Sequence, residues 1–281
     1  MEESQKLLEL DQLFQNEKYD EIEPFILAQI ASAKENENHA AYITFSNELI
    51  GFYRSIGQHE KSLLISEDIL LLMEELGLEE SVHFGTTLLN AATAYRAAGK
   101  SMESLKCYER ALVIYESTLP HEDERFAGLY NNLSLLLQQM GELDKSLIFL
   151  DNALHIIKKT MPDSVETATS LTNKALLLFQ LKRKEEASKC LEEALEIFRT
   201  KNHYNDPHYS AALSGLGEAY FHFGNYEKSI QAYEQAIELI QKSFGKSESY
   251  RIVCYNCAVV CHEAGFSEKE VYYKKEAEGS L

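Results

Sequence analysis

Residues 215–239 read GLGEAYFHFGNYEKSIQAYEQAIEL. Gly224 divides this string at a short turn, and small or apolar residues recur at three- and four-residue spacings on both sides of it. Such spacing places them on one face of a helix, so the string predicts two helices joined by a tight turn. Glycine suits the turn because it readily takes the left-handed conformation in which many helices end. The string therefore predicts an antiparallel helix pair.

Similar turns recur at intervals of 41 or 42 residues along the chain. The turn residues are Gly57, Gly99, Gly141, Lys182, Gly224 and Gly265. A small residue recurs seven positions before and five positions after almost every turn, and residues of fixed small size are typical of helices that cross closely. A period of this length indicates helix pairs that stack one after another. Lys182 is the one turn residue that lacks the conformational freedom of glycine.

We expect a single repeat array of seven helix pairs over residues 1–281. The first pair is degenerate, with helices over 7–15 and 22–33 and a turn near residues 17–18. The predicted divisions are a degenerate N-terminal unit at 1–36, repeats at 37–78, 79–120, 121–162, 163–204 and 205–246, and a C-terminal capping unit at 247–281. The second helix of the capping unit carries charged residues such as Lys274 where earlier units are apolar, which predicts a polar end to the array.

The composition favours a helical protein and excludes several classes of function. Only 13 Gly and 4 Pro occur in 281 residues, too few for the turns of an all-β fold. The net charge is −18 and no basic cluster stands out, so we expect no nucleic acid and no membrane as partner. No apolar run reaches the roughly 18 residues that span a bilayer, and the acidic N-terminus lacks a hydrophobic signal core. Five cysteines, an odd number without a disulfide framework, are typical of a cytoplasmic protein.

The repeated residues resemble those of the tetratricopeptide repeat family. They include Gly217, Tyr220, Gly224, Tyr226, Tyr233 and Ala236 and, in an earlier unit, Tyr95, Gly99, Tyr108 and Ala111. The usual period of that family is about 34 residues. The longer period here, with strings such as YNNLSLL at 130–136, is similar to the kinesin light chain type of repeat. Lys174 and Lys274 depart from the family pattern, which has an apolar and an aromatic residue at these two places.

The resemblance implies an all-α, right-handed superhelical solenoid of about seven antiparallel helix pairs, with a concave groove lined by the first helix of each pair. At 100° per residue, the positions thirteen, nine, six and two before each turn lie on one side of the first helix, and we expect them to line that groove.

Asparagine recurs nine positions before the turns. The residues are Asn90, Asn132, Asn173 and Asn256. Asparagine lowers helix propensity, but its amide both donates and accepts hydrogen bonds, so a row of them can hold the main chain of an extended peptide regardless of its sequence. The family that the chain resembles uses asparagine in this way. The alternatives are that these side chains brace the scaffold or face water.

Other candidate peptide-binding residues lie two or three positions before the turns. They are Arg54, Arg96, Gln138, Gln139, Phe179, Gln180, Phe221 and His222. We expect an acidic or C-terminal group to meet the Arg pair and an apolar side chain to meet the Phe pair. The alternative for each is an ordinary solvated or edge-packed side chain. The clamp of Lys, Asn and Arg with which chaperone-binding members hold a C-terminal carboxylate is missing, which argues against a heat-shock chaperone tail as ligand.

Cys254, Cys257 and Cys261 share one face of a predicted helix beside His262. They invite interpretation as a metal site, but they lie at positions that pack inward in every other unit, and a second ligand pair at zinc-finger spacing is missing. We therefore interpret them as small buried hydrophobic residues and expect no metal and no cofactor. The sequence also lacks a phosphate-binding glycine loop, an HExxH motif and a nucleophile elbow, so we expect no catalytic residue.

These patterns predict a non-enzymatic scaffold for protein–protein interaction that binds an extended peptide or protein segment in its concave groove. Homo-oligomerisation is a further option. Two other interpretations stay open: a stand-alone regulatory peptide sensor of the bacterial pheromone-receptor type, without room for the usual DNA-binding helix-turn-helix, and a structural oligomerisation module. An enzyme hidden in a loop is a third, and the lack of a convergent acid–base pair opposes it.

Overall fold

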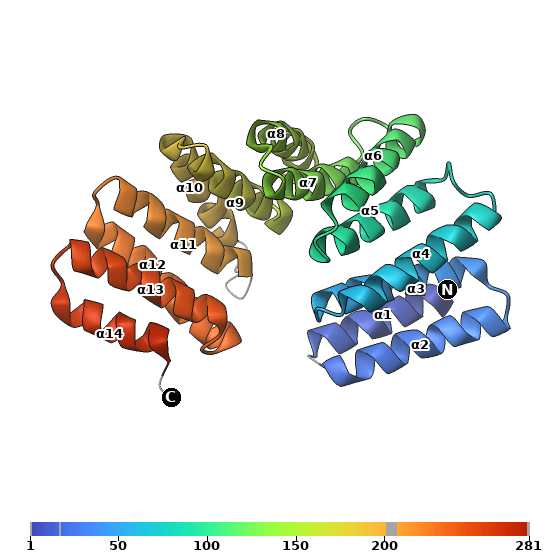
Figure 1. The fold of residues 1–281 in the computed structure, drawn as a ribbon, viewed down its shortest axis with the longest axis horizontal. Coiled ribbons are helices and arrows are strands. Elements are labelled where there is room, and N and C mark those ends of the chain that lie inside the picture. Colours follow the sequence, from blue (N-terminus) through green and yellow to red (C-terminus); the bar gives the residue numbers. More distant parts are fainter. Residues whose placement is uncertain (1, 17, 201–206, 280–281) are drawn as a thin grey trace. The chain divides into compact units, whose positions relative to one another are not determined.

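A computed structural model of the chain describes all residues except 1, 17, 201–206 and 280–281. Its regular elements, in the described part of the chain, are fourteen α-helices (Figure 1). They are α1 (Glu2–Gln15), α2 (Tyr19–Glu35), α3 (His39–Ser55), α4 (His59–Glu75), α5 (Val82–Ala97), α6 (Ser101–Thr118), α7 (Glu124–Gln139), α8 (Leu143–Thr160), α9 (Val165–Gln180), α10 (Lys184–Thr200), α11 (Pro207–His222), α12 (Tyr226–Phe244), α13 (Glu248–Glu263) and α14 (Ser267–Glu278).

The predicted all-α fold of seven antiparallel helix pairs is confirmed for the described residues. The degenerate first pair is present as α1 and α2, while Glu17, at its predicted turn, lies outside the described residues. None of the helices traced over 2–16, 18–200 and 207–279 combines the length and apolar character that crossing a membrane requires.

Two compact units make up the chain, residues 1–136 and residues 137–281. In the first unit α2 contacts α3, α4 contacts α5, and the first helices α3 and α5 also touch each other directly. In the second unit α10 contacts α11, α12 contacts α13, and the first helices α9, α11 and α13 lie in succession. First helices therefore contact each other directly in both units, α3 with α5 in the first and α9, α11 and α13 in succession in the second.

The turns have the backbone conformation that the spacing predicts. The glycines at 57, 99, 141, 224 and 265 have φ between 71° and 81°, in the left-handed region. Lys182 takes the same conformation with φ of 60°, although its Cβ then approaches the following carbonyl. The turn geometry is therefore kept even where glycine is absent.

A repeated hydrogen bond fastens the two helices of a pair. The serine hydroxyl five positions after the turn donates to the backbone carbonyl seven positions before it. The bonds are Ser62 Oγ to Ile50 O at 3.0 Å, Ser104 Oγ to Ala92 O at 2.7 Å and Ser229 Oγ to Gly217 O at 2.6 Å. The helices must lie close for this bond to form, which gives a second reason, beside packing, for the serine that recurs five positions after the turn.

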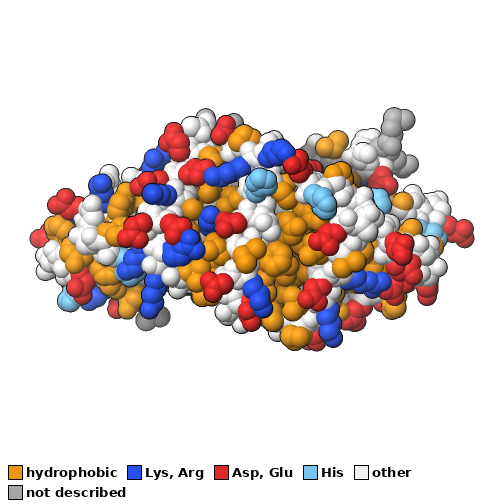
Figure 2. All heavy atoms as spheres, turned by 90° about the horizontal axis from the view of Figure 1, so that it is seen from above, with side chains coloured by type: hydrophobic (Ala, Val, Ile, Leu, Met, Phe, Trp, Pro, Cys, Tyr) orange, Lys and Arg blue, Asp and Glu red, His pale blue; other side chains and the backbone are white. Residues whose placement is uncertain are grey.

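Polar partners account for the departures from the family pattern. Lys174 forms an ion pair with Asp151 at 2.6 Å, and Lys274 donates to Glu270 at 2.5 Å. On the face drawn in Figure 2, acidic, basic and apolar side chains are interspersed. The capping helix α14 buries Tyr273 and leaves Val271 exposed. Its surface is therefore mainly charged, as predicted, but not entirely so.

Candidate functional site

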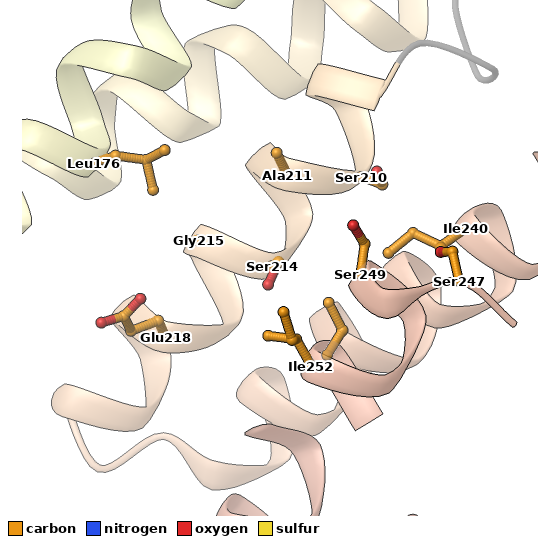
Figure 3. A pocket seen from close by; sticks show the side chains of 11 residues that line it. Leu176, Ser210, Ala211, Ser214, Gly215, Glu218, Ile240, Ser247, Ser249 and Ile252 are labelled. Atoms are coloured by element: carbon orange, nitrogen blue, oxygen red, sulfur yellow. The ribbon is translucent and has the colours of Figure 1, made fainter. Parts of the chain in front are cut away.

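The second unit contains a cavity of about 530 Å³ among α9, α11, α12 and α13 (Figure 3). Leu176 from α9 and Ile252 from α13 approach it from opposite sides of the segment of α11 that carries Gly215. Ile240 of α12 and Ser214 of α11 also line it. The walls are mainly apolar, so the cavity suits an apolar side chain of a ligand.

Gly215 is the reason that the cavity is open at this place. It stands nine positions before its turn, where α5, α7, α9 and α13 carry asparagine. A Cβ added at Gly215 would lie 3.4 Å from Leu191 Cδ1 of α10 and 3.6 Å from Leu176 Cδ2, and of these two residues Leu176 lines the cavity. A longer side chain would therefore take up space beside Leu176.

The wall residues are unusually accessible for their type. Leu176 is 38% exposed and Ile252 is 54% exposed, although most residues of this size in the unit are buried. Leu176 lies six positions before its turn and Ile252 thirteen before its own, and both offsets belong to the face predicted to line the groove. The structure thus places an apolar cavity on that face of the second unit.

Asn173 and Asn256 flank the cavity. Asn173 precedes Leu176 by three residues on α9, and Asn256 follows Ile252 by four residues on α13, so each amide lies on the same helix face as a wall residue. Both residues are half-buried, and neither side chain forms a hydrogen bond with any residue that the structure describes. Their donors and acceptors are therefore free for a ligand.

The other two asparagines of the predicted row are engaged within the protein. Asn90 Nδ2 donates to Asn47 Oδ1 at 2.8 Å, and Asn47 Nδ2 donates to Thr87 Oγ1 at 3.0 Å, which braces α3 against α5. Asn132 Nδ2 donates to the Gly128 carbonyl of its own helix at 2.9 Å. The side-chain amides of Asn90 and Asn132 therefore already form hydrogen bonds within the protein.

The phenylalanine pair contributes to packing. Phe179 and Phe221 are half-buried and lie against the core of the second unit, and the Phe221 ring centre is 6.0 Å from that of Tyr226. The accessible apolar surface in this unit lies at Leu176 and Ile252 instead.

The remaining predicted residues are spread over several helices. Gln138 is half-buried on α7, whereas Gln139 and Gln180 are exposed at the ends of α7 and α9. His222 is exposed at the end of α11, with its Nε2 atom 3.7 Å from Glu218 Oε1. Arg54 and Arg96 come together in the first unit and are described below.

The three cysteines of α13 are buried, as interpreted from the sequence. Cys254, Cys257 and Cys261 have no accessible surface, and burial raises the pKa of all three thiols, which keeps them protonated. Among the described residues, no group of three His, Cys, Asp or Glu side chains is arranged to hold a metal ion.

The sequence reasoning missed Leu176 and Ile252 as candidate binding residues. Two signals could have found them. Both are large apolar residues at offsets predicted to face the groove, and they belong to the helices on either side of Gly215, the one glycine among the six residues of that register. A glycine on one helix, between neighbouring helices that each present a large apolar side chain, indicates a cavity.

Comparison with known families matches this geometry to the tetratricopeptide repeat. A tetratricopeptide repeat model matches residues 125–200 and 209–278, and two further models of the same repeat match 172–243 and 85–123. The chain therefore belongs to the tetratricopeptide repeat family, whose members are generally protein-binding. A comparison with curated proteins gave no match.

Several solved structures share the fold at low sequence identity. BtubC (BKLC) from P. vanneervenii is 21% identical and matches 78% of this chain and 89% of its own, with a TM-score of 0.68. The nearly identical repeats of a putative kinesin light chain from Podosopora anserina are 20% identical and match 71% of this chain and 95% of their own, with a TM-score of 0.60. A Rap protein complexed with competence and sporulation factor is 17% identical and matches 98% of this chain and 75% of its own, with a TM-score of 0.67. The resemblance to kinesin light chain repeats is thus confirmed in the fold.

Proposed function

We propose that the chain is a non-enzymatic scaffold that binds an extended peptide or protein segment across α9, α11 and α13. The observation that supports this most directly is the cavity at Gly215, open between two asparagine amides that have no partner among the described residues. An apolar side chain of the ligand would enter the cavity, while Asn173 and Asn256 would bond its main chain.

The dimensions of the site suit a short extended segment. Packed helices lie about 8–10 Å apart, so two steps from α9 to α13 span about 16–20 Å. An extended chain advances about 3.3 Å per residue, and about five or six residues cover that distance. The two amides would then hold the ligand on either side of one anchoring side chain.

The expected energies favour the apolar anchor. Full burial of a Leu-sized side chain contributes about 1.5–3 kcal/mol, whereas each amide hydrogen bond contributes about 0.5–1.5 kcal/mol net. We therefore expect the cavity to set the selectivity of binding and the asparagines to set the register and direction of the bound chain.

The test uses a displayed library of random peptides. Peptides selected on the wild-type protein are expected to share one apolar residue, and their affinity, measured by fluorescence anisotropy, is expected to fall about tenfold or more in the Asn173→Ala/Asn256→Ala double variant. Asn132→Ala is the matched control, because the Asn132 amide donates within its own helix. Equal loss in the control and in the double variant, or selected peptides without a common apolar residue, would contradict the proposal.

A regulatory peptide sensor is the second candidate function. The fold likeness to a Rap protein complexed with competence and sporulation factor, over 98% of this chain, favours it. In a sensor, the peptide would shift the helix pairs between two arrangements. Small-angle scattering with and without a selected peptide separates the two candidates, because a passive scaffold would keep its scattering profile.

Two further parts of the proposal concern organisation and location. We retain the predicted single repeat array with divisions at its inter-pair connections, and a cytoplasmic location, which the five free thiols favour. The structural oligomerisation module is the alternative to peptide binding, and exposed Val271 and Tyr272 on α14 are its candidate contact. Light scattering that shows a dimer, together with failure to select any peptide, would support that alternative.

A further inference from the structure

Two arginines meet in the first unit, where α3 and α5 lie side by side. The bond from Asn90 Nδ2 to Asn47 Oδ1, 2.8 Å long, fixes the alignment of these helices. Arg54 follows Asn47 by seven residues, and Arg96 follows Asn90 by six, so both side chains lie about two turns beyond this bond at the same level of the two helices.

Neither arginine has an ion-pair partner among the described residues. Three other arginines of the same acidic chain do pair. They are Arg110 with Glu74 at 2.9 Å, Arg125 with Asp123 at 2.7 Å and Arg183 with Glu186 at 2.6 Å. Arg54 is exposed at the end of α3, yet partial desolvation of its guanidinium lowers its pKa, and the neighbouring charge of Arg96 lowers it further. The positive charges of Arg54 and Arg96 thus lie close to each other, and neither is paired with a carboxylate among the described residues.

Tyr108 of α6 completes the group. Its side chain has no accessible surface, and among the described residues no group has good hydrogen-bond geometry to its buried hydroxyl oxygen. Arg96 Nε is likewise buried and without a partner. Burial raises the pKa of Tyr108 to about 12, while the charge of Arg96, a side-chain interaction with Arg96 and the charge of Arg54 act in the opposite direction, so the Arg96 guanidinium lies next to the hydroxyl. Buried polar groups without partners are rare in folded proteins.

The ends of the helices explain only part of this arrangement. Arg54 and Arg96 lie in the last turns of α3 and α5, where a positive charge interacts favourably with the helix dipole. That effect accounts for one arginine on each helix. It does not account for a buried Nε and a buried hydroxyl that both lack a well-formed hydrogen bond in the described structure, nor for two like charges held together.

We propose that Arg54, Arg96 and Tyr108 form a site for an oxyanion, either a carboxylate or a phosphoryl group. A guanidinium presents paired N–H donors in a planar fork that matches two oxygens of such a group, and the tyrosine hydroxyl adds a third donor. A phosphoryl group would offset both charges and a carboxylate one of them, and either would give a hydrogen-bond partner to Arg96 Nε and to Tyr108. The inference rests on the proposed function only in assigning the anion to a bound peptide.

The experiment titrates two small anions, inorganic phosphate and acetate, into the protein labelled with ¹⁵N at arginine. A saturable shift of the Arg96 Nε–Hε signal is expected, with at least tenfold weaker binding in Arg54→Gln and a several-fold loss in Tyr108→Phe. The matched control is Arg110→Gln, which removes a surface arginine already paired with Glu74 and is expected to leave binding unchanged. Circular dichroism verifies that each variant is folded, and Arg54, exposed at a helix end, is the variant least coupled to the core.

The outcomes separate the sources of the anion. Binding of phosphate alone assigns the site to a phosphorylated residue, and binding of both anions assigns it to an acidic side chain or a C-terminus as well. No saturable shift with either anion, or an equal shift in Arg54→Gln, overturns the inference. Because the anions are tested without peptide, their failure leaves peptide binding in the second unit untouched, and failure of the asparagine test leaves this site untouched.

Discussion

Two glycines of α11, Gly215 and Gly217, are expected to respond in opposite directions to substitution by alanine. Alanine in a helix interior is about 0.8–1.0 kcal/mol more favourable than glycine. At Gly215 the new Cβ lies 3.4 Å from Leu191 Cδ1, an ordinary contact, so Gly215→Ala is expected to raise the free energy of unfolding by about 1 kcal/mol. At Gly217 the Cβ lies 3.0 Å from three atoms of the Tyr233 ring.

Tyr233 has little room to move, because it is only 3% exposed. Overpacking of this kind costs about 1–3 kcal/mol, which exceeds the gain in helix propensity, so we expect Gly217→Ala to lower the free energy of unfolding by up to about 2 kcal/mol. A difference of this size between the two variants corresponds to a separation of several degrees in Tm.

Urea unfolding followed by circular dichroism measures both changes. Gly128→Ala is the control, because no atom lies within 4 Å of its added Cβ and the variant reports helix propensity alone. The reasoning is refuted if Gly217→Ala is as stable as Gly215→Ala, since the close approach of α11 to the Tyr233 ring would then carry no energetic consequence.

Three further predictions concern single side chains. Lys182→Gly is expected to raise the free energy of unfolding by about 0.5–1 kcal/mol, because it removes a Cβ from a left-handed turn; an unchanged urea midpoint would show that the turn is not strained. Ser104→Ala removes the 2.7 Å bond to the Ala92 carbonyl and is expected to lower the free energy of unfolding by about 1 kcal/mol, and a loss no greater than that of an exposed Ser→Ala change would contradict a fastening role. Glu48 is exposed over part of its surface, but desolvation of its carboxyl raises its pKa, and the charge of Asp11 adds to the shift. The folded state therefore binds the proton more tightly than the unfolded one, so stability from this group rises as the pH falls through the raised pKa and levels off below the unfolded value of about 4.3. Glu48→Gln is expected to raise the Tm at pH 7 and to flatten this pH dependence, and a parallel Tm profile in the variant would exclude Glu48 as its source.

The fold could be predicted from the sequence because its determinants are local and repeated. The left-handed turn needs a particular φ, which glycine supplies, and the fixed interval made even Lys182 recognisable as a turn residue. The face of each first helix follows from 100° per residue, so the offsets of Leu176 and Ile252 were available in advance.

The roles of the asparagines could not be predicted in the same way. Asn90 and Asn173 hold equivalent positions, and what separates them is the neighbouring helix: α3 offers Asn47 as a partner, whereas Asn173 meets none in the described structure. The serine bond depends on the distance between the two helices of a pair. The surroundings of the buried Tyr108 hydroxyl depend on where the ends of α3 and α5 lie. Such contacts depend on packing across repeats, which the pattern within one repeat does not specify.

The hairpin of α9 and α10 differs from its neighbours in how it is held. Ala187 stands where Ser62, Ser104 and Ser229 form the bond in three other pairs, and Lys182 keeps the left-handed turn although it carries a Cβ. The same hairpin supplies Leu176 to the cavity. One wall of the cavity thus belongs to a hairpin without the serine bond, and we expect the width of the opening to adapt to ligand side chains of different bulk.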